Sequence, residues 1–170
     1  LAANTAAKMG IPFLPSDADD RVFEAVPDDQ PLVIGWHATC EVHELFTPEQ
    51  VDAIRSEHPE TVILAHPECP PEVMAKVDVS GSTKAMVDYI RDVDAPSYTL
   101  LTESAMSDNL AVEFPHRTIL RLTNQRCKHM NYITLDDTLK ALTHLQYKVE
   151  LDPATIEKAL LPIQRMIAIR

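Results

Sequence analysis

The sequence predicts an α/β fold, a three-layer αβα domain with a small parallel sheet, followed by C-terminal helices. From about residue 30, short apolar runs alternate with segments of helical periodicity, as strands and crossover helices do in parallel sheets. Reactive residues directly follow these runs, and ligands bind where the carboxyl ends of parallel strands meet. Apolar residues make up 45% of the 170, enough for a hydrophobic core.

Five apolar runs are the expected strands, at residues 32–36, 61–65, 77–79, 98–101 and 118–122. Residues 11–15 are a weaker strand candidate. The runs are followed by Cys40, His66 and Glu68, Gly81-Ser82-Thr83, Thr102-Glu103, and Cys127. If the strands are parallel, these five groups gather along one edge of the sheet.

The clearest helix start is at Thr47, with Pro48 at the first helical position and Gln50 three residues after the cap. That helix is expected to end near residues 58–59, because the residue before a proline is disfavoured in a helix. Further helices are expected from residue 70, from Ser82 or Thr83, and over 103–112. The acidic stretch 17–20 is predicted to be a solvated loop.

After Cys127 the pattern changes, because no further strand follows. Thr134 is expected to cap one helix and Asp152 the next, which Pro162 should kink. Both helices carry an apolar stripe, so they are expected to pack on another part of the protein.

Composition excludes several functional classes. A net charge of −11 argues against a nucleic-acid partner. No 18-residue apolar stretch or signal-like segment occurs, which predicts a soluble, cytoplasmic protein without a membrane partner. Three cysteines, an odd number, fit a reducing compartment rather than a disulfide scaffold. The chain starts with Leu1, which suggests a fragment of a longer chain.

The cysteines allow two interpretations. Cys40 is either a buried thiol at the end of a strand or a metal or cluster ligand, with His37 and His43 nearby. Cys127 lies between a strand and a helix, where a thiolate is favoured. Cys69 either completes a metal site or packs in the core.

Two other groups combine residues suited to catalysis or binding. His66 and Glu68 share a proline-stiffened turn and form a candidate acid/base pair, although a lone histidine there is more often structural. Ser82 and Thr83 are a candidate anion site, or simply a helix cap. Glu103 is interpreted as an acidic residue in the first turn of a helix.

Taken in order, these segments resemble quinolinate synthase, the iron–sulfur enzyme family of NAD biosynthesis. Residues 40–46 are similar to its Cys-x-Val-His-x-x-Phe segment, and residues 66–68 to its His-Pro-Glu segment. The Gly-Ser-Thr turn at 81–83 and the Thr-Glu pair at 102–103 also match. Residues 127–130 resemble the segment of the third cluster ligand, and residues 160–166 the closing helix.

The resemblance implies three similar α/β domains in a triangular assembly around a 4Fe–4S cluster, with one cysteine from each domain. Cys40 and Cys127 would be cluster ligands, and the open iron would act as a Lewis acid. The substrates would be iminoaspartate and dihydroxyacetone phosphate, with a possible functional link to an iminoaspartate-producing enzyme. His66 and Glu68 would be catalytic and substrate-binding, and Ser82 and Thr83 would bind a substrate anion.

The resemblance also implies a division of the chain. Residues 1–39 would be part of the middle domain, residues 40–127 the last domain, and residues 128–170 a helical tail that packs on an absent N-terminal domain. The departures are Lys128 in place of a proline, glycines replaced before Cys40 and at Ala105, and Cys69, which is not a family ligand. This chain alone is therefore expected to be inactive.

Two alternatives remain open. One is a zinc-binding module without catalysis that uses Cys40, His43, Cys127 and His129. The other is a degenerate relative that keeps the fold and serves as a partner subunit.

Overall fold

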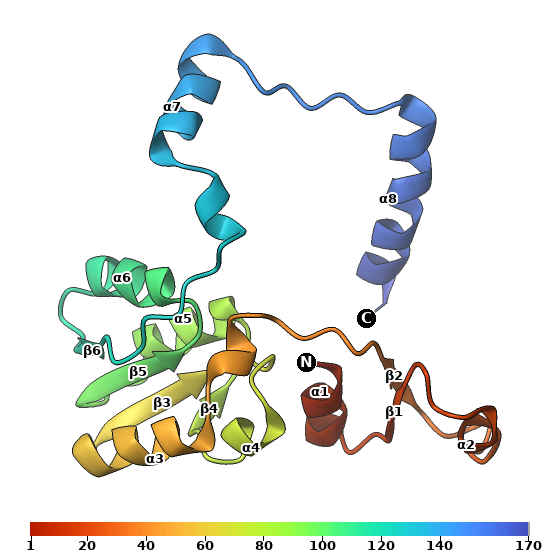
Figure 1. Cartoon of the computed structure of the whole chain (residues 1–170), viewed down its shortest axis with the longest axis horizontal. Coiled ribbons are helices and arrows are strands. Elements are labelled where there is room, and N and C mark those ends of the chain that lie inside the picture. The colour runs from red at the N-terminus through yellow and green to blue at the C-terminus, as the bar shows by residue number, and fades with distance from the viewer. Residues whose placement is uncertain (170) are drawn as a thin grey trace. The chain divides into compact units, whose positions relative to one another are not determined.

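The computed structural model describes residues 1–169, which fall into two compact units. The first unit comprises residues 1–128 and the second begins at His129. The first unit holds every strand of the described chain and is α/β, as the sequence predicts (Figure 1).

A four-stranded parallel sheet forms the centre of the first unit. Its order is β4 (Val79–Ser80), β3 (Thr61–Ala65), β5 (Ser97–Leu101) and β6 (Ile119–Leu120). In the register, Ala65 pairs with Ser80 on one side and with Leu101 on the other. The residues that follow β3, β4 and β5 therefore emerge side by side at one edge.

The first predicted strand does not join this sheet. β2 (Val33–Gly35) pairs in parallel with β1 (Phe13–Pro15) in a separate two-stranded sheet. The expectation that five strands share one edge is therefore wrong for the run before Cys40. Apolar periodicity predicts strands but does not specify which strands pair. A Cβ at position 35 would lie 2.2 Å from the Phe13 ring, so any other residue than Gly35 would require that ring to move.

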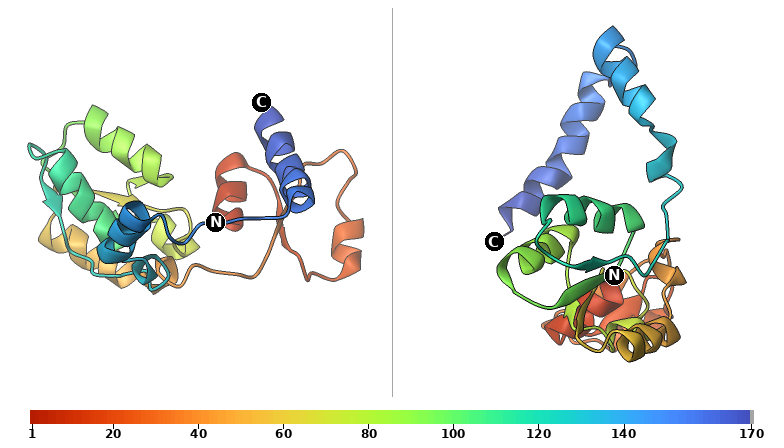
Figure 2. Two further views of the ribbon diagram at one scale, coloured as in Figure 1. Left: turned by 90° about the horizontal axis from the view of Figure 1, so that it is seen from above. Right: turned by 90° about the vertical axis from the view of Figure 1, so that its left-hand side faces the viewer.

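Helices cover both faces of the four-stranded sheet. Ile63 and Ala65 of β3 pack against α3 (Pro48–Glu57) and α4 (Pro71–Met74), whereas Leu64 faces α5 (Thr83–Asp92) and α6 (Ser104–Glu113). This alternation along one strand builds a three-layer αβα arrangement. The right-hand view of Figure 2 shows α5 and α6 on one side of the strands and α3 on the other.

Side-chain caps fix where the helices begin. Thr47 and Gln50 form the predicted capping box of α3, and Ser82 Oγ accepts a hydrogen bond from Ala85 N. Glu103 was expected in the first turn of α6. Instead it precedes the helix and caps it, because its carboxylate accepts a hydrogen bond from Ala105 N. Each cap satisfies a backbone donor that has no partner within its helix.

Two helices near the N-terminus were not expected. α1 (Ala2–Met9) ends at Gly10, whose positive φ of 66° suits glycine. α2 (Asp20–Glu24) begins in the acidic stretch predicted to be a loop, because Asp19 accepts from Arg21 N and so caps the helix. Acidic residues at a helix N-terminus are favourable. The stretch 17–20 is therefore compatible both with a solvated loop and with the start of a helix.

β4 begins later than the run at 77–79. Asp78 still donates its backbone N–H to Ile63 O at 3.0 Å, but Ile63 N donates to the Asp78 side chain. Its Oδ2 accepts from Ile63 N and from Arg55 Nη2, both at 2.8 Å. Arg55 Nη1 also donates to Thr61 O at 3.0 Å. These bonds tie α3 to the two strands on which its apolar face packs.

The second unit contains a short 3₁₀ turn, η2 (Met130–Tyr132), and the helices α7 (Leu135–His144) and α8 (Pro153–Ala168). Thr134 and Asp152 cap α7 and α8 as predicted, and Pro162 lies inside α8. In the described residues of both helices none is buried, and apolar residues such as Leu135, Leu139 and Leu142 are exposed. Among residues 1–169, no helix combines the length and apolar character needed to span a membrane.

Candidate functional site

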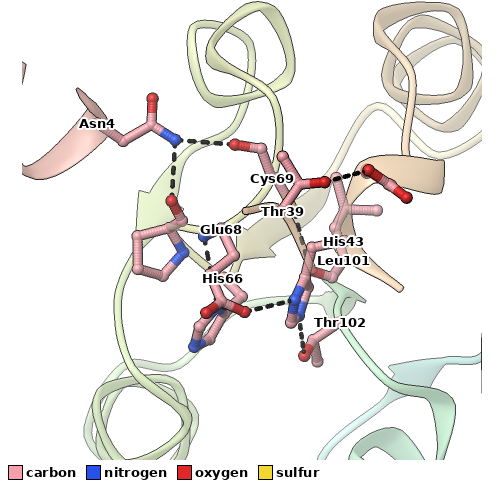
Figure 3. A network of polar contacts seen from close by, with 10 residues as sticks. Asn4, Thr39, His43, His66, Glu68, Cys69, Leu101 and Thr102 are labelled. Carbon is pink, nitrogen blue, oxygen red and sulfur yellow. Dashed lines mark hydrogen bonds and ion pairs between the residues drawn. The ribbon is translucent and has the colours of Figure 1, made fainter. Parts of the chain in front are cut away.

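Three polar side chains meet at the carboxyl edge of the four-stranded sheet. His66 follows β3, Thr102 follows β5, and His66 N donates to Leu101 O at 3.2 Å. His43 comes from the 3₁₀ turn η1 (His43–Leu45), and its ring stacks on His66 with centroids 4.5 Å apart. Figure 3 shows these residues converging from three separate segments.

Glu68 contacts both histidines of the stacked pair. Its Oε2 is 2.9 Å from His43 Nδ1 and 3.5 Å from His66 Nδ1. The Glu68 side chain is 32% exposed, whereas those of His43 and His66 are 10% and 20% exposed. The carboxylate is therefore the member of the group most open to a ligand.

Burial keeps both imidazole rings neutral at neutral pH. Loss of solvent lowers the pKa of His43 and that of His66, and Glu68 only partly opposes this effect. A neutral imidazole has one nitrogen that donates a proton and one that accepts. The pair can therefore move protons and can offer a lone pair to a cation.

His43 is held by its other ring nitrogen. Nε2 lies 3.0 Å from Thr102 Oγ1, which is buried. Nδ1 lies 2.9 Å from Glu68 Oε2, so the carboxylate is its ion-pair partner. Both ring nitrogens of this buried histidine therefore face a polar partner, which fixes the orientation of the ring.

Helix α1 closes one side of the turn that carries Glu68. Asn4 Nδ2 donates to Pro67 O at 2.9 Å and to Cys69 O at 2.8 Å (Figure 3). These two carbonyls flank Glu68, so the amide fixes the backbone on both sides of the carboxylate.

Cys40 joins this group. Its sulfur and the nearest ligand atoms of His43 and Glu68 all lie within 4.8 Å of one another. Cys40 and Glu68 also line a cavity of about 230 Å³ together with Leu1, Ala38 and Thr39. The loop after β2 thus reaches the edge of the larger sheet although β2 does not belong to it.

The other predicted residues have separate places. Ser82 and Thr83 are exposed at the start of α5, next to the end of β4. Cys127 is half-buried near the end of the first unit, and His129 begins the second. Among residues 1–169, neither Cys127 nor His129 belongs to a group of three potential metal ligands, so the four-residue zinc set has only Cys40 and His43 in such a group.

Sequence reasoning missed the contact between His43 and Glu68 and the role of Asn4. The spacing Cys40-x-x-His43 indicated that these two residues act together, and the structure adds Glu68 as the third member. No local pattern marks Asn4, because its partners lie more than 60 residues away in the chain.

Comparison with known proteins identifies the family of the chain. The family model for quinolinate synthetase A protein (NadA) matches residues 1–168. The chain belongs to this family. Quinolinate synthase 2 of Mesorhizobium japonicum is 40% identical over 162 residues, which cover 95% of this chain and 50% of that protein. Quinolinate synthase of Agrobacterium fabrum is 38% identical over 169 residues, or 99% of this chain and 49% of that protein.

A third relative is matched over a shorter stretch of the chain. Quinolinate synthase 1 of Mesorhizobium japonicum is 44% identical over 135 residues, which cover 79% of this chain and 41% of that protein. The chain spans about half the length of the curated relatives it matches. Membership of the quinolinate synthetase A family confirms the resemblance drawn from the motifs.

The three thiols of this family member differ in accessibility. Cys69 is 1% exposed, and its Sγ donates to Leu101 O at 3.5 Å. Burial raises the pKa of Cys69 to about 12. Cys40 and Cys127 are both half-buried. The two predicted cluster ligands are therefore the reachable thiols, and Cys69 is part of the core, contrary to a role as a third metal ligand.

Native Cys69 is expected to resist alkylation. A thiol with a pKa of about 12 is roughly 0.01% thiolate at pH 8, and only the thiolate reacts. Iodoacetamide at pH 8 should modify Cys40 and Cys127 first, with Cys69 reacting only after urea unfolds the protein. Peptide mass spectrometry over a time course measures the order. Modification of Cys69 as fast as Cys127 in the native protein would contradict the buried position.

Proposed function

We propose that this chain forms part of a quinolinate synthase, which condenses iminoaspartate with dihydroxyacetone phosphate and releases phosphate and water. Family membership over residues 1–168 is the observation that carries the proposal. The geometry supports it, because a neutral histidine pair and a partly exposed carboxylate lie at the sheet edge where ligands bind.

His66 and Glu68 are proposed to position the substrate and to move its protons. The condensation needs a base that removes a proton next to a carbonyl or imine, and an acid that protonates the departing oxygen. Glu68 is the more exposed group and reaches the 230 Å³ cavity, so it faces the substrate directly. His66 is neutral and packs against His43, so it can accept or return that proton.

Ser82 and Thr83 are proposed to bind an anionic substrate group. They stand at the N-terminus of the ten-residue helix α5, where backbone N–H groups are unpaired. Both are exposed, although Ser82 Oγ already caps the helix. Thr83 and the free backbone N–H groups would therefore provide most of the contact.

A 4Fe–4S cluster is the proposed cofactor, with Cys40 and Cys127 among its ligands. Thiols are the usual ligands of such a cluster, and Cys40 and Cys127 are the two thiols that are not fully buried. When bound with one open iron, such a cluster supplies a Lewis acid for dehydration. A three-cysteine cluster needs one ligand more than these two cysteines. We propose that the third ligand comes from the rest of the full-length protein.

The remaining predictions concern organisation. We propose residues 1–39 as part of one α/β domain, 40–127 as the next, and 128–170 as a tail that packs on another domain. We also propose a cytoplasmic location, which the three free cysteines support. A functional link to an enzyme that produces iminoaspartate is proposed because imines hydrolyse readily in water.

Anaerobic reconstitution of the full-length protein with iron and sulfide tests this proposal. The wild type should bind about four irons per chain and form quinolinate from both substrates. Cys40→Ala and Cys127→Ala should each abolish the cluster absorbance, whereas Cys69→Ala should retain it. Retention of the absorbance in Cys40→Ala or Cys127→Ala would refute the ligand assignment, and a loaded wild type that makes no quinolinate would refute the activity.

A further inference from the structure

Asn4 of α1 makes two hydrogen bonds to the turn that carries Glu68. Its Nδ2 donates to Pro67 O at 2.9 Å and to Cys69 O at 2.8 Å (Figure 3). Both partners are carbonyl oxygens, so both protons of the amide nitrogen are used on the turn. No backbone N–H of the described residues donates to either carbonyl. Asn4 therefore holds the turn at the two carbonyls on either side of Glu68.

The main sheet holds the same turn at its two ends. His66 N donates to Leu101 O at 3.2 Å, and Cys69 Sγ donates to the same oxygen at 3.5 Å. Glu68 lies between these two anchors, and its own N–H faces His66 Nδ1 at the long distance of 3.4 Å. A hydrogen bond of that length is weak. The two shorter bonds from Asn4 therefore contribute strongly to fixing the backbone from which the carboxylate extends.

Asn4 and Glu68 also line one cavity. Its volume is about 530 Å³, and Leu1, Phe13 and Trp36 are among its other lining residues. This volume lies in the range of small-molecule sites. A carboxylate that removes a proton must lie within hydrogen-bond reach of the reacting atom, and a misplacement of about 1 Å can cost roughly 100-fold in rate. The position of Glu68 relative to α1 is therefore a quantity on which catalysis in this cavity depends.

We propose that Asn4 is a positioning residue, which sets the place of the Glu68 carboxylate relative to α1 by holding the carbonyls of Pro67 and Cys69. The inference rests on the proposed function, in which Glu68 acts on the substrate. Asn4 moves no proton itself and acts through Glu68, because both of its amide protons are bonded to the turn. Since α1 and the turn belong to different segments of the chain, the place of the base depends on how these segments pack.

Substitution of Asn4 in the cluster-loaded full-length protein tests the inference. Asn4→Ala should lower kcat roughly 10–100-fold and change KM less than about threefold, because Glu68 is misplaced while the groups that bind the substrate remain. Asn4→Asp has the same size but presents acceptor oxygens to two carbonyls, so it should be at least as impaired. Asn4→Ser keeps one donor and should fall between Asn4→Ala and the wild type. Alanine favours helix, so α1 is expected to persist in Asn4→Ala.

Asn109→Ala is the matched control, because it makes the same change at an exposed position of α6, and it should stay within about twofold of the wild type. Replacement of Asn4 in a Glu68→Gln background separates positioning from general support. There Asn4→Ala should lower the residual kcat less than about threefold, so that the two losses are not additive. A further loss as large as that in the wild-type background would overturn the inference. A change confined to KM, or an Asn4→Ala variant as active as Asn109→Ala, would also overturn it.

Amide hydrogen exchange in the full-length protein gives a readout that needs neither the cluster nor activity. The prolines at 67, 70 and 71 have no N–H, so the signal between residues 67 and 71 comes from Glu68 and Cys69 alone. Asn4→Ala and Asn4→Asp should speed exchange at these two amides roughly fivefold or more, with β3 unchanged. Unchanged exchange in the turn would overturn the inference. An inactive cluster-loaded wild type would instead refute the proposed function, and the exchange result would still show whether Asn4 holds the turn.

Discussion

Replacing Glu68 by Gln in the full-length protein is expected to lower kcat/KM for quinolinate formation by roughly 10²–10⁴-fold. Glutamine has nearly the same shape but cannot take up a proton, so it keeps the packing and removes the base. Its amide also no longer carries the negative charge that faces His43 at 2.9 Å and His66 at 3.5 Å. Steady-state kinetics on the cluster-loaded protein, with iron content measured in parallel, gives the result.

Glu113→Gln is the matched control, because it makes the same chemical change at an exposed position near the end of α6. It should leave kcat/KM within about twofold of the wild type, since an exposed substitution of this kind changes little. If Glu68→Gln retains more than a tenth of the activity with full iron content, Glu68 is not the base. A change confined to KM would assign it to binding alone.

Replacing Tyr98 by Ala is expected to lower the free energy of unfolding of this chain by about 3–5 kcal/mol. Tyr98 is fully buried on the face of β5 that packs against α5 and α6. Its hydroxyl accepts from Ala95 N at 3.0 Å and donates to Val93 O, so it also closes the turn between α5 and β5. Urea unfolding followed by far-UV circular dichroism measures the change.

Tyr98→Phe separates the two contributions. It keeps the ring and removes the hydroxyl, which leaves Ala95 N and Val93 O without that partner, at an expected cost of about 1–3 kcal/mol. Val112→Ala, at a position that is 81% exposed, should change stability by less than about 0.5 kcal/mol. Equal stability of Tyr98→Ala and Val112→Ala would show that the core is not organised around Tyr98.

Local signals in the sequence determined most of the first unit. The Thr47-Pro48-Gln50 pattern predicted the start of α3, and Ser82 that of α5, because capping depends on residues only a few positions apart. The parallel arrangement of β3, β5 and β6 followed from the alternation of apolar runs with helical segments. Strand partners did not follow, since the run before Cys40 pairs with β1 rather than with the main sheet.

The candidate site was predicted in its residue types but not in its contacts. His66 and Glu68 share one turn, so their proximity follows from the chain itself. The approach of His43 to Glu68, and that of Asn4 to Pro67, depends on how the loop after β2 and helix α1 fold back onto the sheet. Such long-range contacts leave no periodic trace in the sequence.

The pairing of β3 on both sides has a consequence for amide hydrogen exchange. β3 is bonded to β4 and β5, so its N–H groups exchange with solvent only when the main sheet opens. β1 and β2 form an isolated pair, which is marginally stable by itself and opens locally at lower cost. His66 and Glu68 therefore follow a strand of the slowly exchanging main sheet. Asn4 and Cys40 belong to segments next to the β1–β2 pair, which is expected to exchange faster. Hydrogen exchange is therefore expected to be faster on the side of the cavity lined by Ala38, Thr39 and Cys40 than in the strand that precedes Glu68.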